Sequence, residues 1–162
     1  MELPINPIAI PIAAVAALVI GAIWYNPKIG FGNMWLRESG MTEEKMKSGN
    51  MAVIFGLSLV FSAMLAFLLM QFTNHQWGAL GMIGGDPEVA EASFEAFMAD
   101  YGNAFRSFKH GALHGTIFGV AGALPIIGTI ALFERKSAKY IFVNAGYWIV
   151  TLAVMGALLC GL

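Results

Sequence analysis

The chain has 162 residues, of which 58% are hydrophobic and only 12% are charged, and its mean hydropathy is +0.71. These values exclude an ordinary soluble domain and predict an integral membrane protein. The formal net charge of −1 provides no basic field that would indicate a nucleic-acid partner. A single cysteine, Cys160, excludes a disulfide within the chain.

Four stretches of the chain lack Asp, Glu, Lys and Arg. Each is long enough to cross about 30 Å of hydrocarbon as a helix that rises about 1.5 Å per residue. Because the stretches are continuously apolar and do not alternate, we expect helices instead of barrel strands. We therefore predict one all-α membrane domain over residues 1–162 in contact with the lipid bilayer. Its four transmembrane helices are predicted at residues 8–25, 51–72, 111–133 and 140–159.

Aromatic and polar residues gather where the first predicted span ends and where the fourth begins. Trp and Tyr favour the membrane–water boundary because each has an apolar body and one hydrogen-bonding tip. Between them, Gly30 and Gly32 permit tight turns in an apolar segment, for which we expect a hairpin or short helix in the cytoplasmic interface. The predicted membrane-interface cluster comprises Trp24, Tyr25, Asn26, Trp35, Tyr147 and Trp148.

The positive charges indicate which side each loop occupies. Loops 26–50 and 134–139 together contain seven of the nine Lys and Arg residues. Since cytoplasmic loops collect Lys and Arg, we predict these two loops in the cytoplasm and both termini, with loop 73–110, outside.

The acidic outer loop carries a helical pattern of aromatic residues. Asp86 and Pro87 have the character of a helix N-cap and first helical position. Beyond them, large apolar residues recur at spacings of three and four, which predicts an outer amphipathic helix over about residues 87–109.

Three stretches of the sequence resemble a known family. They are WYNPKIGFGNMW from Trp24, TEE at 42–44 and NAGYWIVTLAVMGALL at 144–159. The chain resembles the small bacterial membrane proteins grouped as domain of unknown function 1761. The resemblance implies four transmembrane helices in the bacterial inner membrane and supplies no activity.

Small residues recur every four positions on several predicted helices, a spacing that lets helix backbones approach closely. One interpretation is packing inside a single four-helix bundle. The leading hypothesis is a homo-oligomer, in which this non-enzymatic protein associates with itself or binds another membrane component. Pro125 is expected to kink the third helix near Ala121. The predicted packing seam comprises Ala13, Ala17 and Gly21 on the first helix and Gly111, Gly115 and Gly119 on the third.

The three histidines, His75, His110 and His114, are all predicted at the outer side. His110 and His114 have the i, i+4 spacing that allows two imidazoles to hold one metal ion. Together with Asp86 or Glu88, the histidines could form a site for a divalent cation, and His75 opposite either of the other two could provide the second axial ligand of a b-type haem. The alternative is ordinary hydrogen bonding, so we expect no cofactor unless these histidines hold one.

A channel or carrier is the second functional hypothesis. In an oligomer, His114, Ser58, Ser62 and Asn144 could line a path for a small solute or ion, and His114 is the ionisable group expected deepest in the membrane. The sequence contains no recognisable catalytic constellation, so an enzyme is not expected.

Overall fold

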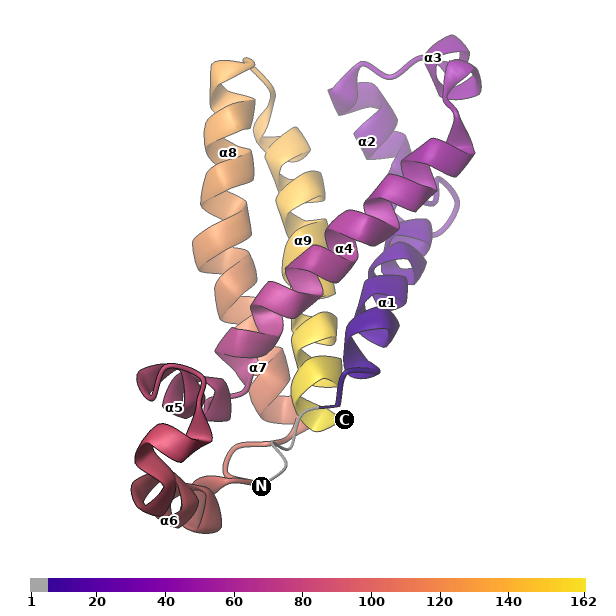
Figure 1. The fold of residues 1–162 in the computed structure, drawn as a ribbon. Helices are drawn as coiled ribbons and strands as arrows, with labels where there is room; N and C mark the ends of the chain where they lie inside the picture. Colours follow the sequence, from indigo (N-terminus) through magenta and orange to yellow (C-terminus); the bar gives the residue numbers. More distant parts are fainter. Residues whose placement is uncertain (1–5) are drawn as a thin grey trace.

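The computed structural model describes residues 6–162, apart from the side chains of Glu43, Ala90 and Glu91. Over these residues the fold is entirely helical, which confirms the predicted all-α class (Figure 1). The elements are α1 (Ala9–Trp24), α2 (Gly32–Ser39), α3 (Glu43–Ser48), α4 (Met51–Thr73), α5 (Gln76–Met82), the 3₁₀ turn η1 (Pro87–Ala90), α6 (Glu91–Tyr101), α7 (Phe108–Phe118), the π-helical η2 (Gly119–Ala123), α8 (Leu124–Phe133) and α9 (Ala138–Gly161).

Three helical runs in the described chain are long and apolar enough to cross a membrane. They are α4, the continuous run Phe108–Phe133 formed by α7, η2 and α8, and α9. α1 is apolar but has only 16 residues, which corresponds to about 24 Å of helix. A multi-pass membrane protein is therefore indicated, whereas a fourth crossing by α1 stays a prediction.

α9 is the central helix of the bundle and contacts α1, α2, α4, α7, η2 and α8. α1 approaches it with a face of alanines, and Ala9, Ala13 and Ala17 are fully buried. Lipid tails are as apolar as these side chains, so close approach and dispersion contacts hold the helices together. The core cluster consists of Ala9, Ala13, Ala17, Ala66, Leu69, Met70, Leu152, Met155 and Leu159.

The glycine seam of the third predicted helix packs against α9 of the same chain. A Cβ at Gly111 would collide with the carbonyl oxygen of Gly156, and one at Gly115 with that of Leu152. A Cβ at Gly119 would lie 2.7 Å from Ile149 Cα. The surface of this seam is therefore occupied within the chain, which agrees with the interpretation of packing inside a single bundle. Association between copies of the chain stays a prediction, and it would have to use a different surface.

Pro125 disturbs the third span at the predicted place. η2 surrounds Ala121, and the backbone N–H of Leu124 donates to the carbonyl of Gly119, five residues earlier. Pro125 has no N–H to donate, and its ring would clash with a carbonyl four residues back. The helix therefore widens by one π turn and then continues as α8.

The segment after α1 folds back onto the end of that helix. The N–H of Phe31 donates to the carbonyl of Trp24 at 2.7 Å, and that of Gly30 to Asn26 at 2.9 Å. A Cβ on Gly30 would collide with the carbonyl oxygen of Trp24, and one on Gly32 would lie 2.7 Å from the backbone nitrogen of Pro27. Glycine is thus required here by close approach of the backbone. The expected short helix is α2.

The outer loop differs from the predicted helix over 87–109. It contains α5, which was not predicted from the sequence, followed by η1 and α6. α6 ends at Tyr101, and a turn begins at Gly102. A Cβ on Gly102 would collide with the carbonyl oxygen of Met98. A new helix begins after Ser107, whose Oγ accepts a hydrogen bond from the N–H of His110 at 3.2 Å. The spacing of the aromatic residues continues through Phe105 and Phe108. The helix itself is interrupted between Tyr101 and Phe108, because Ser107 caps the start of a separate helix, α7.

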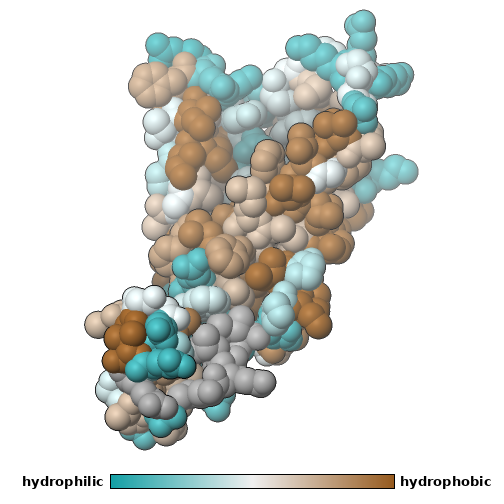
Figure 2. Space-filling model, viewed as in Figure 1, coloured by the Kyte–Doolittle hydropathy of each residue, from teal (hydrophilic) through white to brown (hydrophobic). Residues whose placement is uncertain are grey.

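The two ends of the bundle carry different loops. The C-terminal end of α9, the start of α1 and the α5–α6 segment lie at one end, while α2, α3 and the α8–α9 turn lie at the other (Figure 1). Figure 2 shows hydrophobic side chains along the bundle and hydrophilic ones gathered near α2, α3 and the α8–α9 turn. Among the described residues, loops 26–50 and 134–139 therefore share one end of the bundle, and loop 73–110 lies at the other. Which side is cytoplasmic stays a prediction, and residues 1–5 lie outside the described residues.

Candidate metal centre

Two adjoining polar residues position His75 at the turn between α4 and α5. Asn74, only 2% exposed, donates from Nδ2 to the carbonyl of Leu159 on α9 at 3.2 Å. Gln76, 4% exposed, donates from Nε2 to the carbonyls of Tyr101 and Ala104 at 2.9 and 3.1 Å. The backbone of His75 is therefore held between the bundle and the end of α6.

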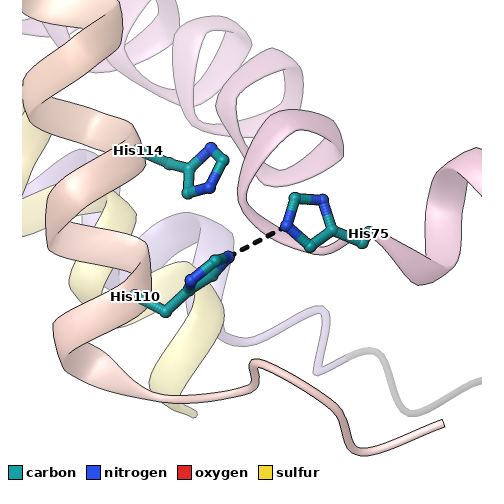
Figure 3. Close-up of side chains that lie close together, drawn as sticks. All are labelled: His75, His110 and His114. Carbon is teal, nitrogen blue, oxygen red and sulfur yellow. Dashed lines mark hydrogen bonds between the residues drawn. The ribbon is translucent and has the colours of Figure 1, made fainter. Parts of the chain in front are cut away.

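α7 supplies the other two histidines from its first two turns. Gly111 and Gly115 face α9, so the residues immediately before them, His110 and His114, are rotated by about 100° to another face of the helix. That face points toward the α4–α5 turn, and the three rings turn toward one another (Figure 3). The glycine contact with α9 thus sets the position of both imidazoles.

The three imidazoles form a compact cluster. The Nε2 atoms of His75 and His110 lie 3.0 Å apart, a hydrogen bond in which one ring donates and the other accepts (Figure 3). The ring centroids of His110 and His114 are 4.4 Å apart, and those of His75 and His114 are 5.1 Å apart. One nitrogen from each ring can be chosen so that all three lie within 4.8 Å of one another.

The ring of Phe105 packs beside the histidine cluster, and this residue was not predicted as a site residue. Its ring centroid lies 5.2 Å from that of His110 and 5.9 Å from that of His75. Its backbone has a φ of 63°, in the left-handed region that a bulky side chain rarely adopts. Gly102 was the sequence signal for a break in the predicted helix. Such a break could have indicated that Phe105 lies in a turn beside the histidines.

The family model described as "Protein of unknown function (DUF1761)" matches residues 8–160. The chain belongs to the DUF1761 family. No curated protein and no solved structure matched it.

The residues predicted to line one path in this DUF1761 protein lie in two places. His114 belongs to the histidine cluster at the α5–α6 end of the bundle. Ser58, Ser62 and Asn144 instead line a cavity between α1, α2, α4 and α9. Among the described residues of one chain, His114 therefore lies apart from the other three predicted path residues.

The predicted membrane-interface aromatics pack directly against one another between helices. Trp24 donates from Nε1 to the carbonyl of Val143 at 2.9 Å, and Tyr25 donates from its hydroxyl to Asn144 Oδ1 at 3.2 Å. The Tyr25 ring lies 5.6 Å from that of Trp35 and 5.2 Å from that of Tyr147. These aromatics therefore join α1, α2 and α9, a role that their sequence positions did not reveal.

Proposed function

We propose that this DUF1761 protein binds a divalent transition-metal ion through His75, His110 and His114. The observation that supports the proposal is the convergence of three imidazole nitrogens within 4.8 Å. In a tetrahedral zinc site with Zn–N bonds of about 2.0–2.1 Å, the nitrogens lie about 3.3–3.4 Å apart. The Nε2 atoms of His75 and His110, 3.0 Å apart, already lie near that spacing.

The ligand set favours particular ions. Imidazole nitrogen suits Zn²⁺, Cu²⁺, Ni²⁺ and Co²⁺, whereas Ca²⁺ and Mg²⁺ take oxygen ligands. Among the described residues, no carboxylate is part of the cluster. Three protein nitrogens leave the fourth tetrahedral position for water or another ligand, as in open sites. The proposed site therefore exchanges its ion or presents it to a second ligand.

A b-type haem fits the geometry less well. In a haem with two axial histidines, the flat macrocycle lies between the two rings. Here the Nε2 atoms of His75 and His110 are in direct contact at 3.0 Å, and His114 packs against both rings. The cluster has the dimensions of a single metal ion, which favours an ion over a haem.

The test measures metal binding by the purified full-length protein in detergent after treatment with a chelator. Titration with Co²⁺ and Zn²⁺ should show one ion per chain, with the visible bands of tetrahedral Co²⁺. Replacing any one histidine with alanine should weaken the affinity at least tenfold, which corresponds to about 1.4 kcal/mol. Zinc at about 100 times its dissociation constant should stabilise the wild type by about 2.7 kcal/mol.

Gln71→Ala is the matched control, because Gln71 is an exposed polar residue one turn before His75 on α4. This variant should bind cobalt and zinc as the wild type does. Equal binding by the wild type and by a variant lacking all three histidines would overturn the proposal.

A further inference from the structure

A cavity of about 650 Å³ lies between α1, α2, α4 and α9, away from the histidine cluster. Small-molecule sites typically occupy about 300–1,000 Å³ and combine apolar and aromatic walls with a few polar groups. This cavity has that composition. Tyr25, Tyr147 and Trp148 form aromatic walls, and Ser58 and Ser62 provide hydroxyl groups from α4.

The two serine hydroxyls distinguish this cavity from a simple gap between helices. Serine and threonine in a membrane helix commonly donate to a carbonyl of the preceding turn, as Thr116 does to Ala112 at 2.8 Å. Within the described part of the chain, neither Ser58 nor Ser62 makes such a hydrogen bond. Ser62 is only 3% exposed as a residue and belongs to the lining of the cavity. A bound molecule with oxygen atoms would satisfy both groups.

The charge of the lining restricts the chemistry of that molecule. The cavity lining contains no Asp, Glu, Lys, Arg or His. A charged group held at this depth would cost several kcal/mol or require a partner of opposite sign. An uncharged molecule with hydroxyl or carbonyl oxygens could hydrogen-bond to both serines and would need no partner of opposite charge.

The cavity is accessible from the hydrocarbon side of α4. Phe55 and Phe61 belong to its lining and are 56% and 61% exposed. On a transmembrane helix such exposed phenylalanines face lipid. A molecule dissolved in the bilayer can therefore reach the cavity from the side of α4.

We propose that this cavity binds an uncharged lipid, whose oxygen-bearing head pairs with Ser58 and Ser62 and whose hydrocarbon chain lies along α4. The site is independent of the metal centre, and neither proposal requires the other.

The experiment uses the full-length protein in lipid nanodiscs and a long-chain alcohol that carries a photoreactive diazirine. The control probe has the same chain and ends in a carboxylate. After irradiation, mass spectrometry should place the alcohol on cavity-lining residues of α4 and α9, and unlabelled hexadecanol should compete. The carboxylate probe should label these residues at least fivefold less.

Two sets of variants test the assignment. Ser58→Phe should fill the cavity and reduce labelling at least tenfold, whereas Val60→Phe, at a lipid-facing position 53% exposed on the same helix, should leave it unchanged. If Ser58→Phe does not fold, the double variant Ser58→Ala and Ser62→Ala removes both hydroxyls at little cost in volume. It should reduce labelling at least threefold.

Three results would overturn the proposal. Labelling of the cavity no stronger than that of lipid-facing Ile126 and Ile130 on α8 would indicate ordinary surrounding lipid. Equal labelling by the carboxylate probe would exclude selection for an uncharged head. A dimer in native mass spectrometry that is lost in Ser58→Phe would assign the cavity to a second copy of the chain.

Discussion

Two described residues other than glycine adopt a left-handed backbone conformation, Phe105 with a φ of 63° and Arg135 with a φ of 59°. This conformation costs an ordinary L-residue about 1–2 kcal/mol. Phe105 packs its ring against two histidines of the candidate metal centre. Arg135 is exposed, and its backbone conformation lets the N–H of Lys136 reach the carbonyl of Ala131 at 2.8 Å and close the end of α8.

Arg135 allows the cost of this conformation to be measured without disturbing either site. Glycine adopts a positive φ without the steric penalty of a Cβ, so Arg135→Gly should be more stable than Arg135→Ala by about 1 kcal/mol. The two variants remove the same charge and are compared by thermal unfolding in one detergent. If alanine proved as stable as glycine, the turn would not need the left-handed conformation.

α7 shows how one helix positions a site through its opposite face. Gly111 and Gly115 bring its backbone against Gly156 and Leu152 of α9, and the neighbouring histidines are turned toward the α4–α5 corner. Close packing with α9 and the geometry of the histidine cluster are therefore coupled. A substitution that disturbs the packing of α7 against α9 should therefore also change metal binding by the histidine cluster.

We expect Gly115→Ala to destabilise the protein by about 1–3 kcal/mol, because its Cβ would overlap the carbonyl of Leu152. Gly128→Ala is the matched control on the same span, since its Cβ would lie 4.0 Å from the nearest side-chain atom, in Ile141. Thermal unfolding provides the comparison. The Gly115 variant should also lose cobalt affinity. Equal stability of the two variants would contradict the packing described here.

At the scale of the whole molecule, the two candidate sites lie in different regions of one bundle. The histidine cluster is beside α5 and α6, and the cavity is beside α2 and the first half of α4. The predicted orientation, with loops 26–50 and 134–139 in the cytoplasm, would place the histidine cluster toward the outside and the cavity toward the cytoplasmic leaflet. The orientation decides which side of the membrane each proposed site faces, whereas neither binding proposal depends on it.

That orientation predicts the accessibility of single introduced cysteines. In intact cells, an impermeant thiol reagent should label Glu88→Cys and leave Lys139→Cys unlabelled, and permeabilised cells should show both. Glu88 and Lys139 are exposed and lie at opposite ends of the bundle, while the native Cys160 is buried and serves as the background. Labelling of Lys139→Cys alone from outside would reverse the two sides.

Several features could be predicted because they depend on residues close in sequence. The apolar length of α4, α9 and the run from α7 to α8 identified the spans. Pro125 marked the disturbed turn, since a missing N–H acts within one helix. The i, i+4 spacing of His110 and His114 placed both rings on one helical face.

Other features depend on contacts between distant segments and were predicted wrongly or not at all. The aromatic periodicity suggested one helix over 87–109, but Gly102 packs against Met98 and Ser107 caps a new helix. The glycine run indicated close packing without naming its partner, and that partner is α9. The sequence offered His75 as a partner for His110 or His114, but only the structure shows that the Nε2 atoms of His75 and His110 lie 3.0 Å apart.

The sequence by itself determined that the chain is helical, that most of its length belongs in a membrane, and which loops share an end. Hydrocarbon accepts only long apolar segments whose backbone groups bond internally, so these properties follow from consecutive residues. Only the tertiary structure decided that the glycine seam is internal, that three histidines converge, and that two serines line a cavity. Those outcomes depend on how close two helix backbones come, which small residues permit without specifying the partner.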